Sequence, residues 1–437
     1  MRLQRYICAV AVALAGAGAG VAQTPVADSD YMPVDAAQVQ LGQMLFYDPI
    51  LSGNRNISCA TCHHPKFATA DGVALSLGEG GIGLGPARRA DPENMPEQRI
   101  PRNAPALFNL GAYEFTRMFH DGRIEVDRDK PGGLRTPMGA EMTQGFANLL
   151  SAQTMFPVLS ADEMAGHYSE NDVSQAVRQG RITGPGGAWD LLAQRVVQTP
   201  AYQPLIAQAF GDAATLSFTD ISDAIAAFVA FEWRSDGSLY DAHLRGQAAL
   251  PAQAVLGKTL FYGAAGCGTC HAGAFQTDHA FHAMGVAQFG PGKGARFESH
   301  ARDTGRMRVT GRAQDAYAFR TPSLRNVAQT GPYGHTGSHA DLTGFITDHL
   351  SPRTALDRFE PASVALPDLA DVDDWQHIND PVEQDALRAV ITRPAVSLPA
   401  ADIAALVAFL ETLSDPTALR GRMGVPDAVP SGLPIDR

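Results

Sequence analysis

This 437-residue chain has fewer basic than acidic residues: it contains 34 Lys and Arg residues and 46 Asp and Glu residues, for a net charge of −12. This acidic balance argues against nucleic acid and against anionic membrane surfaces as partners. Long apolar runs are also missing, since no segment beyond residues 1–22 approaches the roughly 20 apolar residues of a membrane span. We therefore predict no nucleic-acid partner and no membrane span.

Strand signals are scarce as well. The periodic apolar segments have helical spacing, and long loops rich in Gly and Pro join them. The length of the chain is sufficient for two or more domains. The sequence thus predicts a mainly α fold with long loops.

Cysteine is scarce: there are five, and four fall in two copies of Cys-x-x-Cys-His, at 59–63 and 267–271. This pattern is the attachment signature of c-type haem, in which the cysteines bond the vinyl groups and the histidine binds iron. A zinc ribbon would need about 15–20 residues between its Cys pairs, whereas roughly 200 separate these. Two structural disulfides remain an alternative. The motifs predict two covalently bound haem c groups, held by Cys59, Cys62 and His63 and by Cys267, Cys270 and His271.

The fifth cysteine, Cys8, lies in an N-terminal segment with a separate role. A basic start at 1–5 precedes a short apolar run rich in Ala and Gly, and small residues follow up to Ala22. This order is typical of a secretory signal peptide. We predict that residues 1–22 are removed and that the protein is periplasmic, because covalent haem is attached outside the bacterial cytoplasm.

The chain also contains an internal duplication. Segments 41–47 and 256–262 both read Leu-Gly-x-x-Leu-Phe-Tyr, and each precedes one haem motif. Further pairs follow in the same order after each motif: Pro105–Asn109 and Pro322–Asn326, His120–Gly122 and His335–Gly337, and closing helices that begin near Asp220 and Asp402. We predict two tandem homologous cytochrome c-type haem domains, 37–245 and 246–415, followed by an extended tail, 416–437.

Four segments carry a family resemblance: Leu41–His63, Arg102–Arg123, Gln153–Met164 and Phe319–Gly337. They resemble the bacterial di-haem cytochrome c peroxidase family, which includes MauG, the di-haem enzyme that matures methylamine dehydrogenase. The resemblance implies a peroxidatic haem in the N-terminal half and an electron-relay haem in the C-terminal half. It makes His63 the proximal ligand of the first and His271 that of the second.

The same resemblance implies a catalytic pair on the distal side of the peroxidatic haem. Glu163 matches the acid/base that moves a proton between the peroxide oxygens, and Gln153 matches the residue that orients peroxide or water. A positioned carboxylate contributes roughly 10²–10⁴-fold to such a step. Without the resemblance, Ser160 and Glu163 would be taken for the capping box of a helix.

A calcium ion between the haems is also implied. Asn103, Thr330 and Pro332 match its ligands, the first through its side chain and the others through backbone carbonyls. Waters would complete the 6–8 oxygens that calcium takes. The alternative is that Asn103 is only a turn residue.

Glu79 marks the first departure from the family pattern. It stands where the reductively activated members have a histidine that caps the peroxidatic iron. A carboxylate is a poor cap, so we predict an open iron that needs no reductive activation. In the alternative, the Gly-rich loop is misaligned and His64 or another histidine is the cap.

His349 marks the second departure, since the family has methionine or tyrosine as the distal ligand of the relay haem. His349 shares a helical face with Leu342, Phe345 and Ile346. We predict His/His ligation, which gives a lower reduction potential than methionine ligation. A core histidine is the alternative, and Met284 and Met307 are the competing ligands.

Two further departures concern His120 and an extra segment. His120 replaces a tryptophan between the haems that is thought to mediate electron hopping. The segment 351–396 holds Trp375 and many acids. We interpret it as a partner-facing or lid loop, with disordered padding as the alternative.

Together these features favour a periplasmic di-haem peroxidase that reduces hydrogen peroxide with electrons from a small cytochrome c or cupredoxin. One alternative is a MauG-like enzyme that oxidises Trp or Tyr of a partner protein. A second is a non-enzymatic di-haem electron-transfer protein. Dimers are common in the family, so a homodimer is a further expectation.

Overall fold

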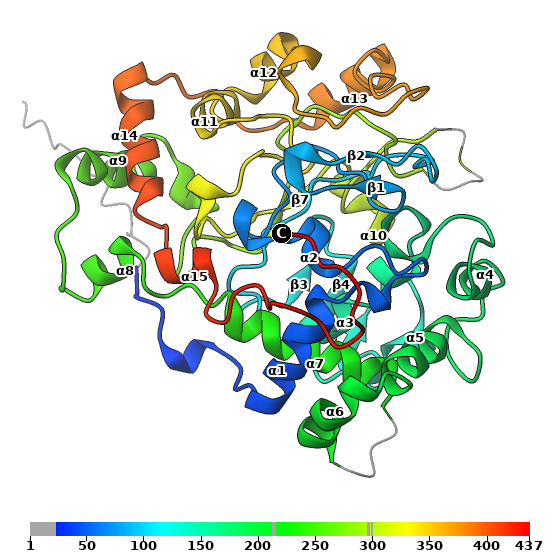
Figure 1. The fold of residues 1–437 in the computed structure, drawn as a ribbon. Coiled ribbons are helices and arrows are strands. Elements are labelled where there is room, and N and C mark those ends of the chain that lie inside the picture. Colours follow the sequence, from blue (N-terminus) through cyan, green and yellow to red (C-terminus); the bar gives the residue numbers. More distant parts are fainter. Residues whose placement is uncertain (1–22, 212–215, 295–297, 299) are drawn as a thin grey trace, which may run out of the picture.

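The computed structural model describes residues 23–211, 216–294, 298 and 300–437, and it is rich in helix (Figure 1). The predicted signal peptide, residues 1–22, lies outside the described residues. The helices are α1 Ala36–Tyr47, α2 Cys59–Cys62, α3 Leu149–Gln153, α4 Asp172–Arg178, α5 Ala188–Val197, α6 Gln203–Phe210, α7 Phe218–Glu232, α8 Leu239–Leu244, α9 Ala252–Tyr262, α10 Met307–Thr310, α11 Leu342–His349, α12 Pro352–Arg358, α13 Pro381–Val390, α14 Ala400–Glu411 and α15 Pro416–Arg420.

The strands are short and form small antiparallel sheets. Their order is β1–β2, β3–β4–β5 and β6–β7. The bounds are β1 Gly81–Ile82, β2 Arg89–Ala90, β3 Arg117–Met118, β4 Ile124–Val126, β5 Leu134–Arg135, β6 Phe281–His282 and β7 Phe319–Arg320. The prediction of a helix-rich fold with few strands is confirmed.

Two helix pairs form the cores, α1 against α7 and α9 against α14 (Figure 1). A Cβ on Gly42 of α1 would overlap the carbonyl oxygen of Ala224 in α7, and a Cβ on Gly257 of α9 would overlap that of Ala405 in α14. Only glycine permits so close an approach of two helix backbones. The repeated Leu-Gly pattern therefore has the same physical cause in both halves.

Aromatic packing repeats in the two pairs. The ring centroids of Phe46 and Phe228 lie 5.4 Å apart, and those of Phe261 and Phe409 lie 5.2 Å apart. These separations are in the favourable range for aromatic pairs. The second pair thus repeats the ring contact of the first.

The C-terminal tail differs from the expected extended segment, because it begins with helix α15. The irregular chain beyond α15 returns to the N-terminal half, where Val429 is buried in the core. The backbone N–H groups of Met423 and Gly424 donate to the Glu232 carboxylate at 2.7 and 2.8 Å. A buried carboxylate of α7 thereby anchors the tail.

The 351–396 segment contains α12 and α13 and packs on the loop that follows the first haem motif. Its Phe359 and Trp375 contact a small core containing Leu75 and Phe289. Its Asp374 forms a buried ion pair with Arg99 at 2.9 Å. The segment is therefore attached to the N-terminal half as well as to its own. Within the described ranges, no helix has the length and hydropathy to cross a bilayer.

Candidate active site

The N-terminal haem motif lines a cavity of about 200 Å³. Cys59 and Cys62 bound α2, and the N–H of His63 donates to the carbonyl of Cys59 at 3.0 Å. The His63 Nδ1 lies 2.9 Å from the carbonyl oxygen of Thr69. A carbonyl can only accept, so Nδ1 carries the hydrogen and Nε2 keeps its lone pair. This is the usual arrangement of a metal-binding histidine.

The C-terminal motif lines a second cavity, of about 280 Å³, in the same way. The N–H of His271 donates to the carbonyl of Cys267 at 2.9 Å. Its Nδ1 lies 3.1 Å from the carbonyl oxygen of Gln276, which leaves Nε2 free. Burial lowers the pKa of His271 to about 4, so the ring is neutral and able to bind a metal.

The donor set of each cavity fits a covalently attached haem. Each contains two free cysteine thiols and one neutral imidazole whose outer nitrogen is hydrogen-bonded. Among the described residues the four cysteines form no disulfide, contrary to the alternative of two structural disulfides. The two motifs also line separate cavities, which does not suit a shared zinc site.

Glu163 and Gln153 both line the N-terminal cavity. Gln153 ends α3, and its Oε1 is buried with no hydrogen-bond partner in the described structure. Burial raises the pKa of Glu163, and the positive charges of Lys293 and Arg123 oppose that rise. A carboxyl group and an amide therefore face the same cavity as His63.

The alternative interpretation of Ser160 and Glu163 as a capping box is contradicted. Glu163 lies on a single π-helical turn, Ala161–Ala165, and the Ser160 side chain makes no cap hydrogen bond. Instead the carbonyl of Ser160 accepts the N–H groups of Glu163, Met164 and Ala165 at 3.2, 3.0 and 2.9 Å. Such turns are frequent at functional sites.

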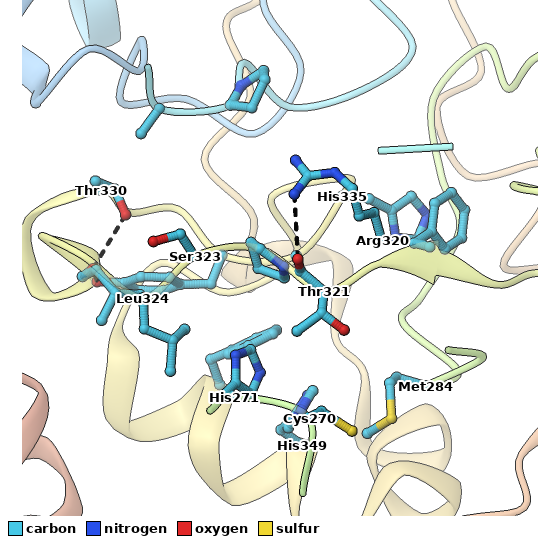
Figure 2. Close-up of a pocket in the computed structure, with 18 of the residues that line it drawn as sticks. Cys270, His271, Met284, Arg320, Thr321, Ser323, Leu324, Thr330, His335 and His349 are labelled. Atoms are coloured by element: carbon cyan, nitrogen blue, oxygen red, sulfur yellow. Dashed lines mark hydrogen bonds between the residues drawn. The ribbon is translucent and has the colours of Figure 1, made fainter. Parts of the chain in front are cut away.

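His349 ends α11 and lines the C-terminal cavity, as do Leu342, Phe345 and Ile346. Figure 2 shows His271, Cys270 and His349 close together, with Met284 beside them. The ring centroids of His271 and His349 are 6.5 Å apart. Two metal–nitrogen bonds of about 2 Å each would separate two facing imidazole centres by roughly 6 Å. Burial lowers the pKa of His349 to about 3, so this ring is neutral too.

The competing ligands differ in position. Met284 lines the C-terminal cavity, whereas Met307 begins α10 and is not among its lining residues.

Glu79 is turned away from the N-terminal cavity. Its Oε1 accepts hydrogen bonds from the side-chain amides of Asn54, Asn56 and Asn94 at 2.9, 2.9 and 2.7 Å. Its backbone N–H donates to the carbonyl of Asp162 at 2.8 Å. Neither Glu79 nor His64 is among the residues that line the cavity.

His120 and Asn103 line both cavities, so they lie between them. The His120 Nε2 is 3.1 Å from the carbonyl oxygen of Asn103, and burial lowers the pKa of His120 to about 4. The Asn103 side-chain amide donates to the carbonyl of Val73 at 2.8 Å, leaving Oδ1 as a free acceptor among the described residues. Thr330 and Pro332 line the C-terminal cavity only.

Lys293 and Arg123 line the N-terminal cavity although no motif predicted them. Arg123 lies inside a family-like segment and could have been noticed there. Lys293 comes from the other half of the chain, and only the fold brings it to this cavity.

Comparison with known proteins agrees with this architecture. A family model described as di-haem cytochrome c peroxidase matches residues 36–249. Cytochrome c551 peroxidase of Pseudomonas aeruginosa is 30% identical over 312 residues, which are 71% of this chain and 70% of the relative. The methylamine utilization protein MauG of Methylorubrum extorquens is 28% identical over 322 residues, 72% of this chain and 69% of the relative.

A solved structure shares the fold. The diheme peroxidase BthA Y463M variant from Burkholderia thailandensis has a TM-score of 0.59 and 21% identity, with 95% of this chain and 94% of that chain covered. The chain belongs to the di-haem cytochrome c peroxidase family. It is an oxidoreductase of that peroxidase family, and membership implies haem cofactors. Its relatives include both cytochrome c peroxidases and MauG.

Proposed function

We propose that this protein is a periplasmic di-haem peroxidase that reduces hydrogen peroxide with electrons from a small cytochrome c or cupredoxin. One observation carries the proposal: the two cavities differ in the residues that line them besides the motif histidine. Glu163 and Gln153 face the N-terminal cavity, whereas His349 lies near His271 in the C-terminal cavity. The first cavity thus has acid/base groups for a substrate, and the second has a pair of neutral imidazoles.

Two tandem c-type haem domains, 37–245 and 246–415, form the framework of the proposal. The repeated helix pairs, with Gly42 and Gly257 at the crossings, support it. Cys59, Cys62 and His63 would hold the haem whose iron binds peroxide. Cys267, Cys270 and His271, with His349 as distal ligand, would hold the haem that passes electrons inward.

Glu163 performs the proton transfer in this mechanism. Its ionised carboxylate would take the proton from one peroxide oxygen and deliver it to the other, which would leave as water as the O–O bond breaks. The haem held by this cavity would supply the two electrons for that cleavage. Burial raises the pKa of Glu163, which suits a group that both accepts and donates a proton. Gln153 hydrogen-bonds the peroxide through its unpaired side chain and orients it.

The sequestered Glu79 supports an iron that is open at rest. Three asparagine amides hold its carboxylate outside the cavity. No capping histidine from this loop lines the cavity within the described chain. The enzyme would thus react with peroxide without prior reduction.

A calcium ion between the haems belongs to the proposal. Asn103, which lines both cavities, offers its Oδ1, and Thr330 and Pro332, which line the C-terminal cavity, offer backbone carbonyls. All three are neutral oxygen donors, and oxygen is the donor that calcium takes. Metal analysis of the purified protein before and after dialysis against a chelator tests it. One calcium per chain is expected, and none would exclude the site.

A MauG-like oxidation of Trp or Tyr in a partner protein is the second candidate. The relative from Methylorubrum extorquens and the uncapped N-terminal cavity favour it. His120, which replaces the tryptophan between the haems, weighs against it because neutral histidine is hard to oxidise. Fast turnover with a small electron donor would favour the peroxidase, and negligible turnover would favour the maturation enzyme.

Low-temperature EPR of the oxidised holoprotein, followed by peroxide addition, tests the main proposal. One high-spin and one low-spin bis-imidazole signal are expected, together with rapid reaction with peroxide and turnover with a reduced cytochrome c. Two low-spin signals without peroxide reactivity would instead support a non-enzymatic electron-transfer protein.

A further inference from the structure

Lys293 enters the N-terminal cavity from the C-terminal half of the chain. Its side chain lines this cavity together with Glu163, Gln153 and Arg123. The chain has four lysines, and the other three, Lys66, Lys130 and Lys258, line neither haem cavity. A lysine at this position is therefore a specific feature of the cavity rather than part of a basic surface.

The loop that carries Lys293 is fixed on both sides. The N–H of Lys293 donates to the carbonyl of Ala301 at 2.8 Å, and the N–H of Gly290 donates to the carbonyl of Asp374 at 2.7 Å. A Cβ on Gly292 would overlap the Ala301 carbonyl oxygen and lie 2.7 Å from the His377 Nε2. Asp374 of the 351–396 segment thus bonds this loop through its backbone carbonyl and Arg99 of the N-terminal half through its side chain.

The charged residues near Lys293 and Glu163 pair with one another and not with these two side chains. Arg102 pairs with Asp303 at 2.6 Å and with Asp121 at 2.7 Å, and Arg123 pairs with Asp121 at 3.1 Å. These acids are therefore engaged. Within the described residues, no hydrogen bond is formed by the Lys293 ammonium or by the Glu163 carboxylate.

An ammonium group and a carboxylate that both face one cavity, without other partners, suit a substrate that accepts and donates hydrogen bonds. A cation near a carboxyl group favours its ionised form. A preorganised donor also stabilises negative charge that develops as a bond breaks. Peroxide meets both conditions, since it gives up a proton and its far oxygen gains charge as the O–O bond lengthens.

We propose that Lys293 is a further catalytic residue of the N-terminal cavity, which keeps Glu163 ionised and donates a hydrogen bond from its ammonium to the bound peroxide. This inference rests on the peroxidase function proposed above. It also assigns a role to the 351–396 segment, which supports the loop that carries Lys293.

The charge of Lys293 is sensitive to pH. Burial and the nearby Arg123 and Arg102 lower its pKa to about 8, while Asp303 and Asp121 oppose the decrease. The ammonium form is complete well below pH 8 and is lost as the pH rises through that value. Burial raises the pKa values of Glu163 and Asp162, and the positive charge of Lys293 opposes both rises. The contribution of Lys293 should therefore decline in mildly alkaline solution.

Fluoride is the probe for the hydrogen bond, because it is a small anion that binds oxidised haem iron and accepts hydrogen bonds. The variants are Lys293→Met, which keeps length without charge, and Lys293→Arg, which keeps the charge. Lys130→Met is the matched control, since Lys130 is exposed and its loss changes the net charge equally. Haem content and thermal stability are measured for each holoprotein first.

A charge-assisted hydrogen bond to a ligand corresponds to about 10- to 100-fold in affinity. Lys293→Met should weaken fluoride binding by that factor, lower kcat/KM for peroxide and abolish the decline of kcat/KM above pH 8. Lys293→Arg should retain fluoride binding and shift the decline to higher pH, and Lys130→Met should behave as the parent protein.

Two outcomes separate this inference from the proposed function. If Lys293→Met binds fluoride and responds to pH as Lys130→Met does, while Glu163→Gln loses peroxide turnover, the role of Lys293 is wrong and the peroxidase stands. If no protein turns over peroxide but fluoride affinity still depends on Lys293, the peroxidase is wrong and the donor role of Lys293 remains.

Discussion

The N-terminal and C-terminal cavities are assembled from the same parts and differ in what faces the motif histidine. In both, a glycine permits two helices to cross closely, and a backbone carbonyl holds the Nδ1 of the histidine. Besides that histidine, the first cavity is lined by Glu163 and the second by His349, whose ring centroid lies 6.5 Å from that of His271. In the proposed enzyme, the shared parts would hold a haem in each cavity, and the residues that differ would decide whether a substrate or a second ligand meets it.

Glu163 and His349 are also held in place by different kinds of structure. Glu163 is held by backbone hydrogen bonds of a single π-helical turn, and Lys293 approaches from a loop of the other half. His349 ends a regular helix whose apolar face lines the cavity. A ligand needs a constant position, which a packed helix provides, whereas acid/base groups can be supplied by loops on a rigid framework.

The largest expected effect comes from removing the acid/base group of the first cavity. Glu163→Gln should lower kcat/KM for peroxide by roughly 10²–10⁴-fold, because the amide cannot accept the proton. Stopped-flow and steady-state assays of the holoprotein measure it. Asp162→Asn is the control, since Asp162 pairs with Gln98 and does not line the cavity. An equal decrease of kcat/KM in both variants would contradict the catalytic role of Glu163.

A change of the opposing histidine should alter the second cavity alone. His349→Met should raise the reduction potential of the C-terminal haem, because thioether ligation raises it relative to imidazole. Potentiometric titration followed by visible absorption measures the shift. Met284→Leu should leave the potential unchanged. If Met284→Leu changes it and His349→Met does not, Met284 is the distal ligand instead.

The two helix crossings, α1 with α7 and α9 with α14, should lose similar stability when their glycine is replaced. Gly42→Ala and Gly257→Ala should each lower the free energy of unfolding by about 1–3 kcal/mol, because the added methyl overlaps a backbone carbonyl. Chemical denaturation measures both. Gly344→Ala is the control, since its Cβ would lie 3.2 Å from the Asp341 side chain and would overlap no backbone carbonyl. Loss at only one crossing would argue against equivalent halves.

The smallest expected effect is a pH dependence of stability in the first cavity. Burial raises the pKa of Glu163 in the folded protein above its unfolded value. The folded state therefore binds the proton more tightly, and its stability falls as the pH rises through that window. Glu163→Gln should be more stable than the parent near neutral pH and equal to it in acid. Thermal denaturation across pH measures this, and parallel curves would contradict it.

Much of the fold followed from local patterns. The helical periodicity of the two Leu-Gly segments predicted α1 and α9, and the closing helices α7 and α14 were expected near Asp220 and Asp402. The two haem motifs were expected to form separate sites, and they line separate cavities. The prediction of an extended tail at 416–437 was wrong for its first residues, which form α15. The Asp415 side chain accepts hydrogen bonds from the N–H groups of Thr417 and Ala418 at the start of this helix.

Other features arose from contacts between distant residues. The capping-box pattern at Ser160 was overridden by a π-helical turn. The asparagine cage of Glu79 draws on Asn54, Asn56 and Asn94, which share no sequence pattern. The ion pair between Asp374 and Arg99 joins residues far apart in the chain. The spacing of residues along the sequence does not predict contacts between residues that are far apart in the chain.

The sequence by itself indicated covalent haem attachment, the helical framework and the candidate residues Glu163 and His349. The Cys-x-x-Cys-His motif can be recognised from the sequence because its two cysteines and its histidine must lie within about one turn of chain. The repeated Leu-Gly pattern can be recognised because the residues that make a helix crossing lie on one face of one helix. Only the tertiary structure decided which groups share a cavity. Glu163 and Lys293 line one cavity because the 351–396 segment binds the loop that carries Lys293. Packing between distant segments, rather than any local pattern, assembled this candidate active site.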